Sequence, residues 1–241
     1  NSVKYDERFF TVDRKAPTGK IEISSNKKKS DKDGYILKNI VQLVYSFFAN
    51  EKITIKMTSE DTMSPIKEQK YYMDNKVIEK DNGLSDSLSL SDLKNKSWSS
   101  ENVKINKNVG ENTVELLKEN TKAVPYLYIK DEAGNETYMT SDGAIYDTKK
   151  PSAPEIKIET KDPVAGVSDP EIEIFNSNVN FSISVEDPVV NGTYSGLAEV
   201  SYKIKNNGTV TQEKKFNNEN NKIKPELNAF ESYAEKVRKI I

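Results

Sequence analysis

The residues best able to carry chemistry in this sequence are its acids, because the chain has no cysteine and no histidine. Without histidine, Ser-His, Cys-His and zinc-dependent mechanisms are excluded for this chain alone. A glycosidase would need two carboxylates flanking a cleft. Asp61, Glu186 and Asp187 each follow a predicted strand, where an acid is typical of a turn. We therefore expect no catalytic residue and no enzyme activity.

Two segments carry oxygen ligands of the kind that a calcium ion prefers. Asp31 and Asp33 alternate as in a calcium loop, but the third acid and the closing glutamate of such a loop are missing. Asp131 and Asn135 also offer oxygens near a junction between units. A charged turn is the favoured interpretation of both segments, so we expect no metal and no cofactor.

A Lys–Asn isopeptide bond is a third chemistry that suits a chain without cysteine. It needs a lysine, an asparagine and a carboxylate that are buried together. Lys20, Lys203 and Lys205 are the candidate lysines. All three alternate with apolar residues in predicted strands, so we favour surface positions for them.

Aromatic residues are the candidates for ligand contact. Exposed aromatic rings stack on sugars and anchor protein interfaces. We take Tyr71, Tyr72 and Trp98 as candidate ligand contacts. Packing is the competing interpretation, because tyrosines that alternate along a strand usually face a core.

The composition of the chain argues against two kinds of partner, nucleic acids and the interior of a membrane. The chain has 36 Lys and Arg against 38 Asp and Glu, a formal net charge of −2. That balance provides no basic excess for phosphates, so a nucleic-acid partner is not expected. No run of about 20 apolar residues is present, so no membrane segment is expected in this chain.

An internal repeat organises the sequence. The matched blocks are 1–18 with 135–152, 53–57 with 181–185, and 64–75 with 195–206. In the first block Asp13 aligns with Asp147, and Pro17 aligns with Pro151. Three blocks in the same order indicate a repeated structural unit. The repeat predicts that 1–14 end a preceding unit, 15–150 form one complete unit, and 151–241 form a second unit that is truncated or divergent.

Most of the pattern predicts strands. Apolar and polar residues alternate at 21–23, 53–57, 156–158, 179–185 and 200–204, and 124–130 and 136–140 are rich in β-branched or aromatic residues. Asp131–Asn135, Asn191-Gly192 and Asn207-Gly208 are turn signals. The spacing predicts a helix at 36–48 and one or two helical turns at 91–97. Helical spacing recurs at 228–241, where a truncated inter-strand segment that closes over the sandwich is the favoured interpretation.

The blocks resemble the bacterial immunoglobulin-like repeats of Gram-positive cell-surface proteins. The resemblance is carried by Asp13–Ile23, by Ser195-Gly196-Leu197 with Tyr202, by Tyr128–Tyr138 and by Ser141–Asp147. The first unit departs from the pattern with Ser64-Pro65 in place of Ser-Gly, and the second unit lacks the Ala-Gly-Asn hairpin.

The resemblance implies an all-β chain of tandem immunoglobulin-like antiparallel β-sandwiches with short helical insertions. It implies a non-catalytic spacer in a secreted or wall-attached bacterial protein, located outside the cell and touching neighbouring repeats. Two alternatives stay open. One is an adhesin or binding module for a host or cell-surface glycan or protein, and the other is an accessory module of a large secreted glycan- or protein-degrading enzyme.

Overall fold

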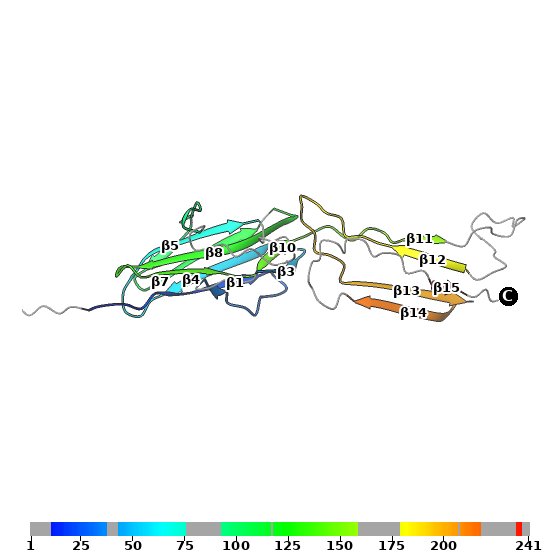
Figure 1. The fold of residues 1–241 in the computed structure, drawn as a ribbon, viewed down its shortest axis with the longest axis horizontal. Coiled ribbons are helices and arrows are strands. Elements are labelled where there is room, and N and C mark those ends of the chain that lie inside the picture. Colours follow the sequence, from blue (N-terminus) through cyan, green and yellow to red (C-terminus); the bar gives the residue numbers. More distant parts are fainter. Residues whose placement is uncertain are drawn as a thin grey trace, which may run out of the picture. The chain divides into compact units, whose positions relative to one another are not determined.

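A computed structural model describes residues 11–37, 43–75, 93–116, 118–158, 179–206, 208–217 and 235–237. The chain divides into two compact units, Asn1–Thr148 and Lys149–Ile241. Both units consist of strands (Figure 1), so the all-β class is confirmed. In the described part of the chain, no helix is long and apolar enough to cross a membrane.

Unit 1 contains two sheets. The first sheet has the order β1-β4-β7-β6, from β1 (Thr18–Ser24), β4 (Ile53–Glu60), β7 (Val109–Leu116) and β6 (Lys104–Asn106). The second has the order β2-β9-β8-β10-β3, with β5 also paired to β8. Its strands are β2 (Tyr35–Ile36), β3 (Tyr45–Ala49), β5 (Ile66–Asp74), β8 (Thr121–Asp131), β9 (Glu136–Thr140) and β10 (Gly143–Tyr146).

The main core of unit 1 is formed by residues from both sheets. Burial alternates along β4, where Ile53, Ile55 and Met57 are fully buried, because successive strand residues point to opposite faces. These side chains cluster with Leu127 and Ile129 of β8. Unit 1 is therefore sandwich-like, with apolar residues of both sheets meeting in one core.

A second apolar cluster involves the other set of β8 side chains. Val124 and Tyr126 are buried with Leu93, and Trp98 is among the half-buried residues packed against them. Strand β8 is thus covered on both faces, which explains its continuous apolar sequence.

The helical spacing at 36–48 predicted the wrong structure. Tyr35–Ile36 form β2 and Tyr45–Ala49 form β3, while 38–42 lie outside the described residues. Phe47 joins the main core and Tyr45 packs on the second cluster. A strand with apolar neighbours on both faces produces a dense apolar run that periodicity alone does not separate from a helix.

The other two segments with helical spacing contain little or no helix where they are described. In 91–97, only Leu93 and Lys94 have helical backbone, with the Lys96 N–H donating to the Leu93 carbonyl at 3.1 Å, and 91–92 lie outside the described residues. In 228–241 the described part is β15 (Glu235–Val237), which is a strand. Short helical insertions are therefore reduced to one turn in the described part of the chain.

A buried polar network lies between β4, β5 and β7. Gln69 donates to Asn112 Oδ1 at 2.6 Å and accepts from the Ser59 hydroxyl at 2.5 Å. All three side chains are at least 97 % buried. Gly110 makes room for them, because a Cβ at this position would overlap Gln69 Oε1 and lie 2.6 Å from Ser59 Oγ.

A loop covers the free edge of β1. The Ile21 N–H donates to the Asp33 carbonyl at 2.9 Å, and the Ser30 N–H donates to the Ile23 carbonyl at 2.7 Å. Lys32 anchors this loop through an ion pair with the buried Asp142 at 2.7 Å. The hydrogen bond from Lys32 to Asp142 raises the pKa of the lysine. Covering an edge in this way blocks unwanted strand pairing.

Unit 2 contains a three-stranded sheet and a hairpin. The sheet has the order β11-β12-β15, from β11 (Glu155–Ile158), β12 (Val179–Ser184) and β15. The hairpin joins β13 (Glu199–Asn206) to β14 (Thr209–Asn217). The predicted turns are confirmed where they are described: Asn191 and Gly192 have φ of 54° and 69°, and Gly208 has φ of 80°.

Candidate functional site

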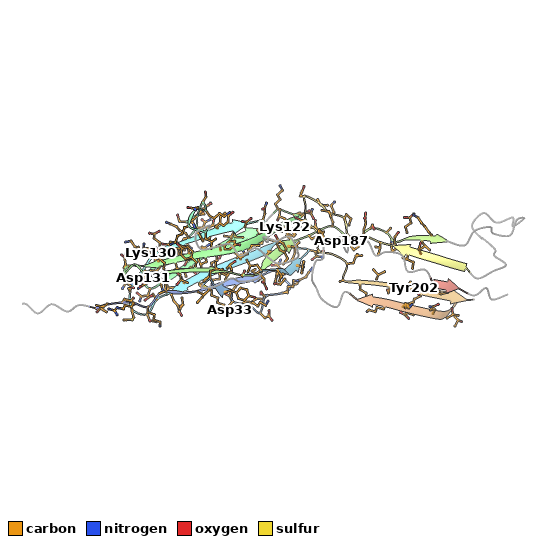
Figure 2. The ribbon with its side chains drawn as sticks, in the orientation of Figure 1. Asp33, Lys122, Lys130, Asp131, Asp187 and Tyr202 are labelled. Atoms are coloured by element: carbon orange, nitrogen blue, oxygen red, sulfur yellow. The ribbon has the colours of Figure 1, made fainter. Side chains whose placement is uncertain are left out.

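Three carboxylates meet at one end of unit 1. Asp13 precedes β1, Asp61 follows β4, and Asp131, which is labelled in Figure 2, is the last residue of β8. One carboxylate oxygen from each lies within 4.8 Å of the others. Asp131 is fully buried and Asp61 is 7 % exposed. We call these three residues the entry cluster, because the chain enters unit 1 there.

Neutral donors hold each carboxylate of the entry cluster. Asp61 Oδ1 accepts from the N–H groups of Met63 at 2.7 Å and Ser64 at 2.8 Å. Both oxygens of Asp131 accept from Asn135, through its backbone N–H and its side-chain amide, each at 2.8 Å. Turn geometry explains both sets, since Asp side chains readily bond to backbone groups a few residues ahead.

Asp13 is tied to unit 1 by a side chain from the loop before β5. The Ser64 hydroxyl donates to Asp13 Oδ2 at 2.7 Å, while the Lys15 N–H donates to Asp13 Oδ1 at 2.8 Å. Asn135 Nδ2 also donates to the Asp13 carbonyl at 3.3 Å, and Thr137 donates to the Pro17 carbonyl at 2.6 Å. The segment that precedes β1 is therefore fixed to unit 1 at several points.

The negative charges of the entry cluster are stabilised by hydrogen bonds from uncharged donors. In the described part of the chain, no lysine or arginine forms an ion pair with Asp13, Asp61 or Asp131. Burial by itself would raise the pKa of Asp131. The hydrogen bonds from Asn135, Ser64 and Gly134 outweigh burial, and the pKa of Asp131 falls below its usual 3.8.

The donor set of the entry cluster is oxygen-only and negative, which is the chemistry that holds a hard cation. Five of the six carboxylate oxygens already accept hydrogen bonds from protein groups. These hydrogen bonds therefore fix the segment before β1 to unit 1. The turn at Asp131 and Asn135 was visible in the sequence, whereas its meeting with Asp13 and Asp61 was not.

The chain leaves unit 1 at the other end of β8. Thr121, the first residue of β8, pairs with Tyr146, the last residue of β10. The Asp147 N–H then donates to the Ala49 carbonyl at 2.9 Å. Because β8 has 11 residues, the entry and exit ends are separated by about 33 Å of strand. Lys122 and Asp131 mark these two ends in Figure 2.

The aromatic candidates do not share one surface. Tyr71 packs against the main core, whereas Tyr72 and Trp98 pack on the second cluster. The ring centroids of Tyr72 and Trp98 are 6.3 Å apart, and the Trp98 indole N–H donates to the Leu93 carbonyl at 2.9 Å. The structure therefore brings Tyr72 and Trp98 together and separates Tyr71 from them.

Three further tyrosines lie near Tyr72 and Trp98, and we call these five residues the aromatic face. The three tyrosines are Tyr126, Tyr128 and Tyr138, with Trp98 lying 5.9 Å from Tyr128 and 6.1 Å from Tyr138. Burial is the main cause that raises the pKa of all three phenols. Alternation along β8 and its pairing with β9 were the signals that could have placed them on one face.

The remaining candidates lie apart from the entry cluster. Asp187 Oδ2 accepts from the N–H groups of Ser195 and Gly196 at 3.0 and 2.6 Å, as a turn carboxylate does. Asp31 is exposed, and Asp33 is paired with Lys20 at 3.1 Å. Side chains of Lys20 and Lys203 are 40 % and 52 % exposed, so neither has the burial that an isopeptide bond needs. Lys205 is also exposed.

Two comparisons with known proteins identify no relative of this chain. A scan against protein-family models gives no match, and a search of curated proteins gives no significant match either.

Proposed function

We propose that this chain is a non-catalytic, immunoglobulin-like repeat region of a secreted or wall-attached bacterial surface protein, in which each unit acts as a spacer. The observation that carries the proposal is the position of the two ends of unit 1. The chain enters beside Asp131 and leaves beside Thr121, at opposite ends of β8. A unit built in this way adds its full length to the chain that passes through it.

The pairing order of unit 1 supports an immunoglobulin-like assignment. The order β1-β4-β7-β6 corresponds to strands A, B, E and D of a constant-type immunoglobulin sandwich. Strands β5 and β8, with β9 and β10 as one interrupted strand, correspond to C, F and G. Strands β2 and β3 are then additions at the outer side of strand G.

The repeated sequence blocks support a spacer made of successive units. Asp13 and Pro17 recur as Asp147 and Pro151 on the two sides of the boundary between unit 1 and unit 2. In unit 1 the first of these residues is the acceptor that Ser64 binds. Prolines near the junction limit the backbone conformations of the connecting segment.

A distance measurement tests the spacer geometry. The chain has no cysteine, so spin labels at Lys15→Cys and Lys118→Cys, both within unit 1, would occupy unique positions. We expect a narrow distribution centred beyond about 33 Å, because the labels bracket the length of β8. A broad distribution, or one centred well below that length, would reject unit 1 as a rigid spacer.

A binding module is the second candidate, and the aromatic face favours it. Tyr72 and Trp98 lie on one side of the second sheet together with Tyr128 and Tyr138. Glycan and protein arrays test this candidate directly. Binding that is lost in Tyr72→Ala and kept in Lys52→Ala would establish a ligand surface, since Lys52 pairs with Glu115 of the first sheet. The spacer proposal expects no array signal.

A further inference from the structure

The terminal strands of unit 1 are arranged along the line between its entry and exit. Strand β1 begins at the entry end, where Thr18 pairs with Glu60, the residue before Asp61 of the entry cluster. Strand β10 finishes at the exit end, where Tyr146 pairs with Thr121. Both strands run from the entry end towards the exit end, as Figure 1 also shows for β1 and β10.

Tension applied through the chain ends therefore pulls each terminal strand along its own axis. Strand β1 would slide past β4, with which it forms a ladder from Thr18↔Glu60 to Ser24↔Thr54. Strand β10 would slide past two neighbours at once, antiparallel β8 and parallel β3. Sliding loads the bonds of a ladder together, whereas peeling breaks them one after another.

From this geometry we propose that unit 1 is a mechanical element that resists unfolding under end-to-end tension, with β1 and β10 as its two shear clamps. The inference rests on the proposed spacer function, since a spacer between a cell and a distal contact carries force. It goes further because a spacer of the same length needs no particular resistance to tension.

Contacts at both ends add to the clamps. At the entry, Ser64 and Thr137 hold the segment before β1 through Asp13 and the Pro17 carbonyl. At the exit, the Gly143 N–H donates to the Val44 carbonyl at 2.8 Å, and the Asp147 N–H donates to the Ala49 carbonyl at 2.9 Å. The parallel pair β3·β10 thus has one of these hydrogen bonds at each of its two ends.

The two clamps slow the unfolding of unit 1 under load, because forced unfolding is governed by the barrier and not by the equilibrium stability. The signature of these clamps is dependence on the direction of pulling. The same folded molecule should resist strongly when β1 and β10 are sheared and weakly when β10 is peeled from β8.

Single-molecule force spectroscopy on the full chain gives a matched comparison. Handles at Lys15→Cys and Lys150→Cys pull unit 1 end to end. Handles at Lys118→Cys and Lys150→Cys pull at the exit end only, where Lys118 precedes Thr121 of β8. All three lysines are exposed in the structure, and no native cysteine competes for the handles.

We expect the end-to-end unfolding force to be at least about twice the same-end force at equal loading rate, because only the first geometry loads the ladders together. Equal forces, or a lower end-to-end force, would overturn the inference. The label distance between residues 15 and 118, both within unit 1, is measured separately, so a failed clamp and a failed spacer are distinguishable. Thermal melts of both double variants verify that each is folded before it is pulled.

Discussion

Ser64 and Asp13 lie 51 positions apart in the sequence, and the Ser64 hydroxyl donates to Asp13 Oδ2 at 2.7 Å. This bond joins the segment before β1 to the loop before β5. The same serine also donates its N–H to Asp61, so one residue connects two carboxylates of the entry cluster. The way the chain enters unit 1 is therefore part of the folded unit.

Replacing Ser64 with alanine should loosen this entry. The variant loses one charge-assisted hydrogen bond and leaves Asp13 with fewer donors, which costs about 1–3 kcal/mol of unfolding free energy. Urea titration followed by tryptophan fluorescence gives the value. Ser100→Ala, at an exposed serine, is the matched control and should stay within about 0.5 kcal/mol of the parent. Equal losses of unfolding free energy in the two variants would show that the Ser64 hydroxyl does not stabilise the entry.

Acid should weaken unit 1 through Asp131. The pKa of this carboxyl is lower in the folded chain than its usual 3.8, so its ionised form favours the fold. That stabilisation is present above about pH 5 and is lost as pH falls through the folded pKa. The Asp131→Asn variant should show a shallower loss of melting temperature between about pH 5 and pH 3.

Asp31→Asn serves as the control for the acid experiment. Asp31 is exposed, and its replacement removes the same formal charge from the chain. We expect this variant to keep the parent slope of melting temperature against pH. If Asp131→Asn also keeps the parent slope, the hydrogen bonds from Asn135 do not stabilise the charged form.

A methyl group at residue 110 should disturb the buried polar network. The Cβ of Gly110→Ala would overlap Gln69 and lie 2.6 Å from Ser59 Oγ, both of which are enclosed in the core. We expect a loss of about 1–3 kcal/mol, as for other overpacked sites. Adding Gln69→Ala removes the nearer of the two overlaps and leaves the Ser59 hydroxyl free to shift, so the double variant should lose less than the sum of the two single variants. Strict additivity in chemical denaturation would contradict the overlap.

Trp98 should act as a structural residue. Its ring packs against Tyr72, Tyr128 and Tyr138, and its N–H is bonded to the Leu93 carbonyl. Trp98→Ala is expected to cost about 2–4 kcal/mol in denaturant unfolding followed by circular dichroism. Trp98→Phe keeps a ring and should cost less. A Trp98→Ala variant with parent stability would favour a ring held for a ligand.

Strand alternation accounts for much of what the sequence could predict. The period of two at 53–57 and 200–204 predicted strands correctly, because one residue in two is more buried than its neighbours there. The same period implies that Tyr71 and Tyr72 face opposite sides of β5, which separates two of the proposed ligand contacts. The segment 36–48 failed because an irregularity in the β3·β10 pairing shifts the register between Tyr45 and Phe47, which then pack on different clusters and break the period of two.

The entry cluster could not be derived from the sequence. Asp13 lies in the segment before β1, Asp61 directly follows β4 and Asp131 ends β8, and only the packing of the two sheets brings them together. Local chemistry could predict each turn by itself, as it did for Asp131 and Asn135. The meeting of three acids depends on strand lengths and register, which alternation does not determine.

Small-angle X-ray scattering of the full chain in solution tests the central claim most directly. A single compact domain of 241 residues would have a radius of gyration of about 18 Å. If each unit is a spacer that is entered and left at opposite ends, the measured radius should be at least about 1.5 times that value, with a pair-distance distribution skewed to long distances. A radius close to about 18 Å with a symmetric distribution would contradict the spacer account.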